Sequence, residues 1–474
     1  MILAARDGRD GPEPSSTEIM IRARTNDMAR QRYRLAAWST LFSLLARTLA
    51  LITLVVAMRS ALPHLGEERF GVWMTIASLG LLLSFLDFGI GAALIGAIAE
   101  ANARGGTPEV QKVATGAVLL LVGLGLIASF VVIVVVLVVP MQWLFKGASP
   151  PALAEARDCA LTLAALLGAS IPSQGMIRIC DGMQRGWIGH LLGSACSAFA
   201  IAVLVHLPGY GAGTPAYLLA TYGVQQLPGI LVGAWLVLAG RWHRAALCSL
   251  AALLGGMRLL RRGAHFVVLQ IAASIGIASS TLIVSAELGP VQVADLAIVQ
   301  RIFSLVSLPL MVLNASLWPA YADANARDDR EFIRKTVGRA MLATSGLAAI
   351  GATIVTLARN DIVGLFSAGQ LAPGTTLIVW FAVWTIFDAV GTAIGMYLNG
   401  RSLLAPQVVI SSLFTLGGIA GMIFAVRHTG LVGVPVATTV SWLVFVAVPL
   451  LTVYRRKCMP AAPQRSALSA SGRG

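Results

Sequence analysis

Long apolar stretches separated by short polar segments run through almost the whole chain. Twelve of them are long enough to form membrane-spanning helices, because crossing the hydrocarbon core of a bilayer takes about 20 mostly apolar residues. They lie at 35–58, 70–94, 114–138, 157–180, 187–207, 215–239, 264–286, 293–317, 340–358, 375–397, 405–426 and 431–453. The pattern predicts an all-α integral membrane protein with about 12 transmembrane helices.

The composition agrees with this class and excludes a soluble globular protein. Of the 474 residues, 57% are hydrophobic and only 12% are charged, and the mean hydropathy is +0.80. Soluble domains carry about 25% charged residues. We therefore expect a polytopic membrane protein.

The net charge of +14 would fit a nucleic-acid-binding protein, but the distribution of the charges indicates a membrane orientation instead. If the N-terminus is cytoplasmic, the inner segments hold 27 of the 35 lysines and arginines, and the outer loops hold six. Such an excess is typical of cytoplasmic loops, so both termini are predicted to be cytoplasmic. Anionic lipid head groups account for the basic clusters, so membrane lipids, and no nucleic acid, are the expected partners.

An early segment, 65–104, aligns without a gap onto a later one, 288–327, so that every position is displaced by the same amount along the chain. Twelve of the forty aligned positions are identical, and both copies begin with Leu-Gly and end with Ala-Asn-Ala-Arg. Chance similarity in a chain rich in Ala and Leu is the alternative interpretation. A true repeat of six helices predicts two six-helix halves in one orientation around a central cavity.

The repeat and the polar segments together predict the domain organisation. The expected parts are a disordered cytoplasmic N-terminal tail (1–34), an N-terminal six-helix bundle (35–240), a cytoplasmic linker (241–263), a C-terminal six-helix bundle (264–454) and a cytoplasmic C-terminal tail (455–474). The basic, amphipathic linker suits a helix that lies on the inner leaflet.

Two arginines, Arg47 and Arg301, lie inside predicted spans, and Arg178 lies near the cytoplasmic end of another. An isolated arginine at the bilayer centre costs about 2.5–3.5 kcal/mol. These arginines must therefore face a water-filled cavity or pair with an acid. In a purely structural role, Arg47 would form an ion pair with Asp87, and Arg301 would form one with Asp388. The functional alternative for the two aspartates is gating or ion coupling.

Polar side chains also recur at helical spacing within several spans, which places them on one face of each helix. In the first, seventh and eighth spans they are Thr40, Ser43, Gln270, Ser274, Gln300, Ser304 and Asn314. The fourth span adds Ser170 and Gln174, and the tenth adds Thr385 and Thr392 on the face of Asp388. Polar faces on several spans predict a shared aqueous cavity.

Motifs for catalysis, cofactors or metals do not occur in the sequence. The five cysteines show neither paired spacing nor a metal pattern, and the six histidines are scattered. The chain contains no HExxH, GxSxG or Walker-type glycine loop. We therefore expect a protein that is not an enzyme, with no catalytic residue, no metal site and no cofactor.

The stretch "GEERFGVWMTIASLGLLLSFLDFGIGAALIGAIAEANARG" is similar to the early segment of Wzx-type polysaccharide and O-antigen flippases of the MOP (multidrug/oligosaccharidyl-lipid/polysaccharide) exporter superfamily. In these proteins an outer loop carries a Gly, followed by an aromatic residue and a second Gly. Near the inner end of the second helix they carry Asp, then an aromatic residue or Leu, then Gly, then Ile or Leu, then Gly. Here the elements are Gly66, Phe70 and Gly71, followed by Asp87, Phe88, Gly89, Ile90 and Gly91.

The resemblance implies a transporter in the bacterial cytoplasmic membrane that flips an undecaprenyl-diphosphate-linked oligosaccharide to the outer leaflet by alternating access. It implies that cavity cations meet the diphosphate or anionic sugars, a role that Arg47, Arg301 and Arg178 fit. A polysaccharide polymerase and export machinery are the implied partners. We expect the polyprenyl tail to leave the cavity between the first and eighth spans.

Two other functions compete with this hypothesis. A cation-coupled multidrug antiporter of the same superfamily would favour acidic residues in the first and seventh spans, which instead carry Arg47 and Gln270. A membrane polymerase or ligase would need a large outer loop, whereas the predicted outer connections are each shorter than about 20 residues, close to the minimum that joins neighbouring spans.

Overall fold

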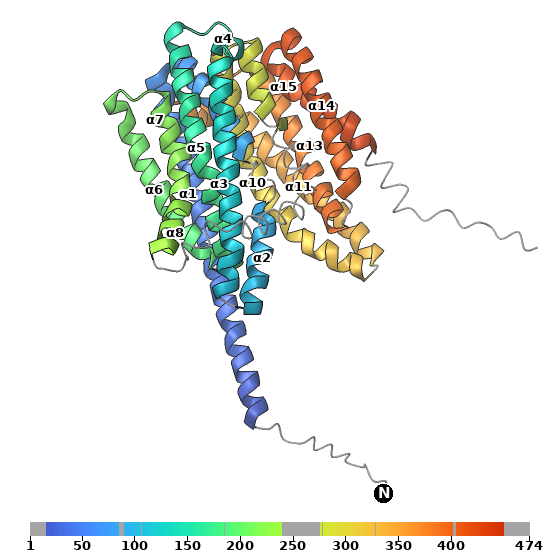
Figure 1. Ribbon diagram of the computed structural model, residues 1–474. Coiled ribbons are helices and arrows are strands. Elements are labelled where there is room, and N and C mark those ends of the chain that lie inside the picture. The colour runs from blue at the N-terminus through green and yellow to red at the C-terminus, as the bar shows by residue number, and fades with distance from the viewer. Residues whose placement is uncertain are drawn as a thin grey trace, which may run out of the picture.

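The computed structural model describes residues 16–84, 90–105, 107–183, 185–238, 275–276, 278–327, 329–401 and 404–449. The N-terminal helices are α1 (Ser16–Ser84), α2 (Ile90–Gly105), α3 (Thr107–Val138), α4 (Met141–Leu144), α5 (Pro150–Gly182), α6 (Gly186–His206), α7 (Thr214–Leu218) and α8 (Leu227–Leu238). A further helix covers 278–287. It is followed by α10 (Pro290–Ala326), α11 (Arg330–Leu357), α12 (Arg359–Ser367), α13 (Thr375–Gly400), α14 (Leu404–Thr429) and α15 (Gly433–Trp442). The predicted all-α membrane fold with two halves is confirmed (Figure 1).

Eight stretches of the described residues are long and apolar enough to cross a membrane, and two of them contain a reversal of the chain. In α1 the backbone is non-helical at Gly66 (φ 74°, ψ 168°). Ala50 and Ala77, on either side of it, line one cavity, although a straight helix between them would be about 40 Å long. The other reversal is at Gly430 (φ 64°), between α14 and α15.

Turn glycines support the internal repeat. Among the residues that the structure describes, six glycines have positive φ, a conformation that costs glycine little. They form three pairs with nearly the same spacing along the chain: Gly66 with Gly289, Gly147 with Gly369, and Gly211 with Gly430. Single π-helical turns at Leu219–Gly223 and Leu443–Ala447 form a fourth pair with that spacing. The two halves therefore share their turns and their helix irregularities in the same order.

The N-terminal segment differs from the prediction. Residues 16–34, which we expected to be disordered, are helical and continue α1 beyond the bundle (Figure 1). The physical reason is that no Gly or Pro occurs between Ser16 and Leu62, so the membrane helix propagates into residues 16–34, where five arginines, two methionines and two alanines are good helix formers. The predicted linker 241–263 and the C-terminal tail lie outside the described residues.

The two halves meet at the end of the bundle that carries Gly66, Gly147 and Gly289, which we call the closed end. There the Ser285 hydroxyl donates a hydrogen bond to the Leu144 carbonyl oxygen (2.7 Å). The Lys146 Nζ donates to the Glu287 carbonyl oxygen (2.9 Å). These two hydrogen bonds thus connect the N-terminal half to the helix 278–287 of the C-terminal half.

The hydrophobic core shows the same asymmetry between the two ends. Near the closed end one core cluster joins both halves and includes Phe70, Trp73, Phe303 and Phe381. At the opposite end, which we call the open end, one cluster contains only residues of the N-terminal half, around Ile98 and Val110. Another contains only residues of the C-terminal half, around Tyr321 and Ile333. The halves are therefore packed together at the closed end and packed separately at the open end.

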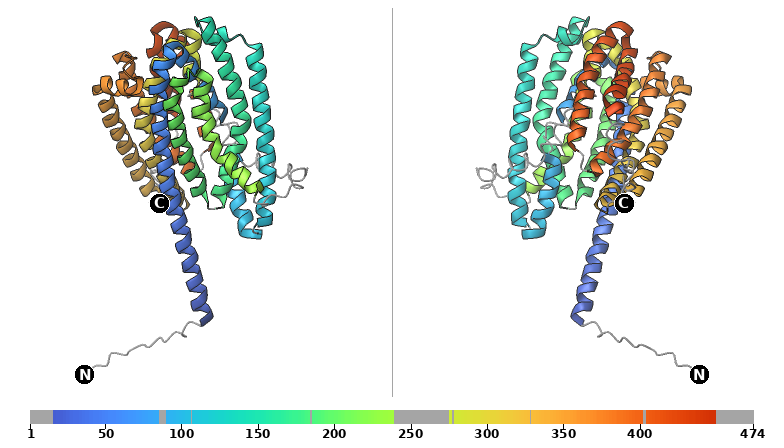
Figure 2. Two further views of the ribbon diagram at one scale, coloured as in Figure 1. Left: turned by 90° about the vertical axis from the view of Figure 1, so that its left-hand side faces the viewer. Right: turned by 90° about the vertical axis from the view of Figure 1, so that its right-hand side faces the viewer.

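The views of the whole molecule show this arrangement of the helices. In Figure 1, α11 and α14 lean away from α3 toward the bottom of the view. The N-terminal extension of α1 projects below the bundle, at the open end, in both views of Figure 2. The structure thus has an open end on the side where the prediction places the cytoplasm.

Close packing of α5 against α8 depends on Gly229. A Cβ atom at this position would lie 2.1 Å from the Ser173 carbonyl oxygen, and the Ser173 hydroxyl donates to the Gln226 carbonyl oxygen (2.7 Å). We expect Gly229→Ala to push the helices apart and to destabilise the protein by about 1–3 kcal/mol. Thermal unfolding in detergent measures the effect. Gly123→Ala on α3, where a Cβ meets nothing within 4 Å, is the control, and equal melting temperatures would contradict the expectation.

Candidate functional site

Two cavities lined by described residues lie among the helices, and residues of several spans line each of them. The larger, of about 630 Å³, is formed mainly by the C-terminal half and is called the C-half cavity. The smaller, of about 490 Å³, is formed mainly by the N-terminal half and is called the N-half cavity. Both volumes fall in the range of about 300–1,000 Å³ that is usual for ligand pockets.

Arg301 on α10 lines both cavities, as does Met74 of α1. The arginine is half-buried. Within the described part of the chain, no carboxylate lies within salt-bridge distance of its guanidinium. A guanidinium stays protonated at any physiological pH, so the junction of the two cavities carries a positive charge that no described acid neutralises.

The N-half cavity combines cationic and amide side chains. Arg178 near the end of α5 lines it and is exposed, with its Nη1 3.6 Å from Asp181 Oδ2. The other polar lining residues are Thr53, Ser170, Gln174, Thr221, Tyr222, Gln225 and Gln226. Arg178 and Arg301 are the charged residues of this lining. The cavity therefore offers hydrogen-bond donors and positive charge, which suit an anionic group.

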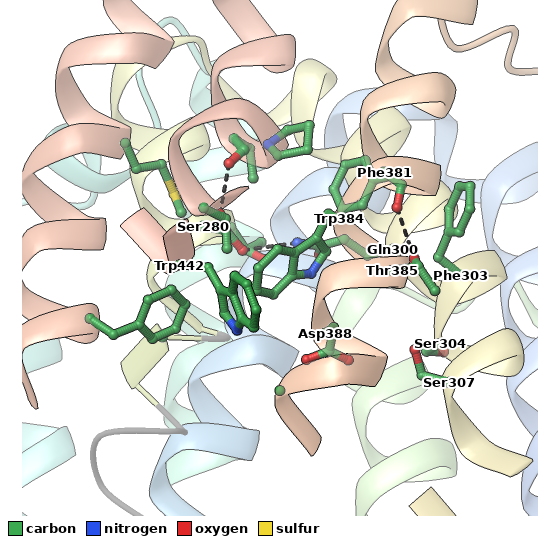
Figure 3. Close-up of a pocket in the computed structure, with 18 of the residues that line it drawn as sticks. Ser280, Gln300, Phe303, Ser304, Ser307, Phe381, Trp384, Thr385, Asp388 and Trp442 are labelled. Carbon is green, nitrogen blue, oxygen red and sulfur yellow. Dashed lines mark hydrogen bonds between the residues drawn. The ribbon is translucent and has the colours of Figure 1, made fainter. Parts of the chain in front are cut away.

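The C-half cavity combines one carboxylate with aromatic rings and hydroxyls. Asp388 on α13 lines it together with Trp384, Trp442 and Phe414. Trp384 stacks on Phe414, with ring centroids 6.3 Å apart and an interplanar angle of 10°. In Figure 3 the Asp388 carboxylate lies between the Trp442 ring and the hydroxyls of α10.

Small residues shape this cavity as well. A Cβ atom at Gly391 would lie 2.8 Å from the Trp442 indole nitrogen, so the indole lies directly against the backbone of α13. Phe387 packs on the same indole, with ring centroids 5.3 Å apart. The Trp442 ring is thus fixed by Gly391 and Phe387 where it lines the cavity.

Several hydroxyls that line the C-half cavity are bonded to their own helices. The Thr385 hydroxyl donates to the Phe381 carbonyl oxygen (2.8 Å), and the Thr392 hydroxyl donates to the Asp388 carbonyl oxygen (2.9 Å). The Gln300 side-chain amide donates to the Ser280 hydroxyl (2.9 Å). A hydroxyl that donates in this way keeps its lone pairs as acceptors, so the wall accepts hydrogen bonds more readily than it donates them.

The structure places some of the predicted site residues on the cavities. Arg301 lines both, Arg178 lines the N-half cavity, and Gln300, Ser304 and Asp388 line the C-half cavity. Arg301 and Asp388 share a cavity but form no ion pair within the described residues. The structural alternative in which these two side chains neutralise each other is therefore wrong for this conformation.

Other predicted residues lie elsewhere. Arg47 is exposed and Ser43 is half-buried, and neither of them is among the described residues that line these two cavities. Asn314 is fully buried, away from both linings, and neither atom of its amide has a hydrogen-bond partner in the described part of the chain. The predictions for Asp87, Gln270 and Ser274, and for the side chain of Thr40, lie outside the described residues.

Arg47 nevertheless lies close to the N-half cavity along α1. Ala50 and Leu54 line that cavity and follow Arg47 at i+3 and i+7, the spacing of one helix face. The face of α1 that borders the cavity therefore continues through Arg47 one turn nearer to the open end. Its predicted place inside a cavity stays a prediction, because the face of α1 beyond Ala50 lies next to the described lining.

Sequence reasoning missed two groups of lining residues. Tyr222, Gln225 and Gln226 lie in the sixth span, where the helix changes from α through π and 3-10 turns to α again. The adjacent pair Gln225 and Gln226, followed closely by Pro228, was a signal for this, and π turns are frequent at functional sites. The tryptophans gave no such signal, because aromatic residues in a span can equally face lipid.

The family comparisons agree on one group of proteins. Residues 34–325 match the family model described as "Polysaccharide biosynthesis protein". Residues 266–425 match the model described as "MatE". Among curated proteins, none matches the chain.

Solved transporter structures have the same fold. An "inward-facing conformation of a multidrug resistance MATE family transporter of the MOP superfamily" has a TM-score of 0.73 at 16% identity, covering 88% of this chain and 100% of the other. The "Lipid II flippase MurJ, inward closed conformation" has a TM-score of 0.68 at 14% identity, covering 88% and 87%. An outward-facing MATE transporter reaches only 0.55 at 17% identity, covering 87% and 95%. The arrangement of the halves is thus nearer to the inward-facing structures.

Proposed function

Because the chain belongs to the polysaccharide biosynthesis protein family of the MOP superfamily, we propose that it flips a lipid-linked oligosaccharide. The substrate of this proposal is an undecaprenyl-diphosphate-linked oligosaccharide. It moves from the inner to the outer leaflet of the bacterial cytoplasmic membrane, where a polymerase assembles it into exopolysaccharide, capsule or O-antigen. The protein is a multi-pass transporter that makes and breaks no covalent bond in this process.

The single observation that carries the proposal is the position of Arg301. Its guanidinium lies where the two cavities meet, without a described acidic partner. Holding such a charge inside a membrane protein is costly unless a counter-charge or water compensates it. A diphosphate is that counter-charge, since guanidinium binds phosphate oxygens in a bidentate manner.

The asymmetry of the two ends supports alternating access. In the proposed orientation the open end faces the cytoplasm, in agreement with the excess of Lys and Arg there. The head group is received from the inner leaflet while the closed end, held by the shared core, seals the outer side. Rocking of the halves then opens the outer side, and the polyprenyl tail stays in lipid throughout.

We assign Arg47 and Arg178 to the capture of the head group at the cytoplasmic margin of the cavity. Arg47→Ala should slow flipping less than Arg301→Ala, because Arg47 is exposed and its charge is screened by water and salt. Arg47→Lys should retain part of the rate. The initial rate of export at low and high salt measures this. An alanine variant that flips at the full rate at low salt would contradict the assignment.

Flipping in reconstituted vesicles tests the proposed function. Purified protein is inserted into liposomes that contain a fluorescent polyprenyl-diphosphate oligosaccharide, and a membrane-impermeant quencher reports how much of the lipid is in the outer leaflet. We expect transbilayer movement of the diphosphate-linked lipid. Movement that is no faster than in protein-free vesicles would refute the proposal.

One observation favours a second candidate function, a cation-coupled multidrug antiporter. The carboxylate of Asp388 and the rings of Trp384 and Trp442 line one cavity, and a carboxylate with aromatic faces also suits an organic cation. The match of residues 266–425 to the MatE model lies in the same half. Efflux of a cationic dye that Asp388→Asn abolishes, without flipping of the sugar lipid, would establish this function instead.

A further inference from the structure

We infer that the C-half cavity is a chamber for uncharged sugar rings and that Asp388 excludes acidic sugars from it. The inference rests on the proposed function and names the class of oligosaccharide that the site accepts. It follows from a difference between the two cavities in charge, in aromatic content and in hydrogen-bonding capacity.

The charged groups are divided between the cavities. Arg178 and Arg301 are the charged residues lining the N-half cavity, whereas Asp388 is the acid lining the C-half cavity. Arg301 at their junction belongs to both linings. A diphosphate held by Arg301 on the N-half side therefore directs the sugars attached to it into the C-half cavity, where Asp388 is the charged lining residue other than Arg301.

The aromatic rings of the C-half cavity suit pyranose rings. Trp384 and Trp442 come from two different helices, α13 and α15, and both line the cavity. An aromatic face carries partial negative charge, so it attracts the C–H bonds on the flat side of a sugar ring, which carry partial positive charge. The cavity thus offers stacking surfaces that require no charge on the ligand.

The hydrogen-bonding groups suit a ligand that donates. Thr385, Thr392 and Thr438 each give their hydroxyl proton to a carbonyl oxygen of their own helix. Their lone pairs and the two carboxylate oxygens of Asp388 are left as acceptors. Neutral sugars present several hydroxyl donors, and a carboxylate can accept two of them at once.

The same carboxylate discriminates against uronic acids. A sugar carboxylate brought next to Asp388 places two like charges in a partly dehydrated space, and such a juxtaposition costs several kcal/mol in an interface. Arg301 cannot compensate both anions while the diphosphate occupies it. Specificity against a partner of the wrong charge commonly relies on such a repulsive element.

Vesicle flipping with two probe lipids tests the inference. Both carry a polyprenyl diphosphate, one with a neutral trisaccharide and the other with the same trisaccharide ending in a uronic acid. We expect wild-type protein to flip the neutral lipid faster by on the order of tenfold or more. Asp388→Asn should reduce the ratio of the rates toward one, and Asp388→Glu should preserve it. Asp361→Asn, which alters an exposed carboxylate on α12, is the matched control and should leave the ratio unchanged.

The aromatic part of the inference is tested with Trp384→Leu and Trp442→Leu. Each should slow the neutral lipid several-fold, whereas Trp143→Leu, which alters a residue that is 75% exposed, should have no effect. Purified variants are first compared with wild type by thermal unfolding. If another variant is unstable, Asp388→Glu, which keeps the negative charge and should preserve the ratio of the rates, still tests the role of the charge.

The outcomes separate this inference from the proposed function. Equal rates for the two lipids in wild type, or a ratio that Asp388→Asn leaves unchanged, would overturn the sugar chamber while flipping itself stands. Failure of wild type to flip either lipid would overturn the proposed function and the inference with it.

Discussion

Arg301→Ala is expected to abolish flipping of a diphosphate-linked sugar by protein that still folds and inserts. Removal of one partner from a buried, hydrogen-bonded charge pair costs about 2–5 kcal/mol, which corresponds to a loss of affinity of about 30- to 5,000-fold. Arg301→Lys keeps the charge but not the planar fork, so it should retain part of the rate. The rate of transbilayer movement in vesicles measures both variants.

The matched control for this experiment is Arg339→Ala. Arg339 is an exposed arginine of α11 that lines neither cavity, so its loss changes the net charge by the same amount. We expect it to flip at the wild-type rate. Equal rates for Arg301→Ala and wild type would remove the observation on which the proposed function rests.

Gly71→Ala is expected to weaken the closed end of the bundle. A Cβ atom at this position would lie 1.7 Å from the Pro290 carbonyl oxygen. The part of α1 that follows Gly66 and the start of α10 must therefore separate. Overpacking of this kind costs about 1–3 kcal/mol. Because the contact joins the two halves, the cost falls on the arrangement in which this end is closed and should raise the open population at this end by about 5- to 150-fold.

Labelling from outside the cell measures this shift. A single cysteine replaces Ser304, which lines the C-half cavity, in a variant without native cysteines. A membrane-impermeant thiol reagent added outside should then react faster when Gly71→Ala is present. Gly123→Ala, which introduces the same methyl group where nothing lies within 4 Å, should leave the labelling rate unchanged. A rate that Gly71→Ala does not raise would argue against closure through this contact.

The two cavities also refine the comparison between the competing functions. The first and seventh spans carry Arg47 and Gln270 in place of the acids that a cationic drug would favour, but the carboxylate of the C-half cavity lies on α13. A positive junction at Arg301 and a negative wall at Asp388 are both present. Under the proposed function, a diphosphate-linked neutral sugar would neutralise the first with its anionic part and avoid repulsion at the second with its uncharged part.

Most of the architecture was predictable from the sequence. A span in lipid must satisfy its backbone hydrogen bonds internally and stay apolar over its length, and both requirements are visible in a one-dimensional pattern. The gapless internal alignment predicted two equivalent halves. It aligns Gly66 with Gly289, and both of these glycines have positive φ. Arg301 and Asp388 were recognised as site residues because charges are rare in spans.

The tertiary structure alone decided which face of each helix borders a cavity. Lipid and protein interior are equally apolar, so a span does not reveal by hydrophobicity which side meets its neighbours. For this reason Trp384 and Trp442 were not recognised as lining residues. The position of Arg301 between two cavities required both halves to pack, since the residues that line these cavities with it come from α1 and other helices distant in sequence.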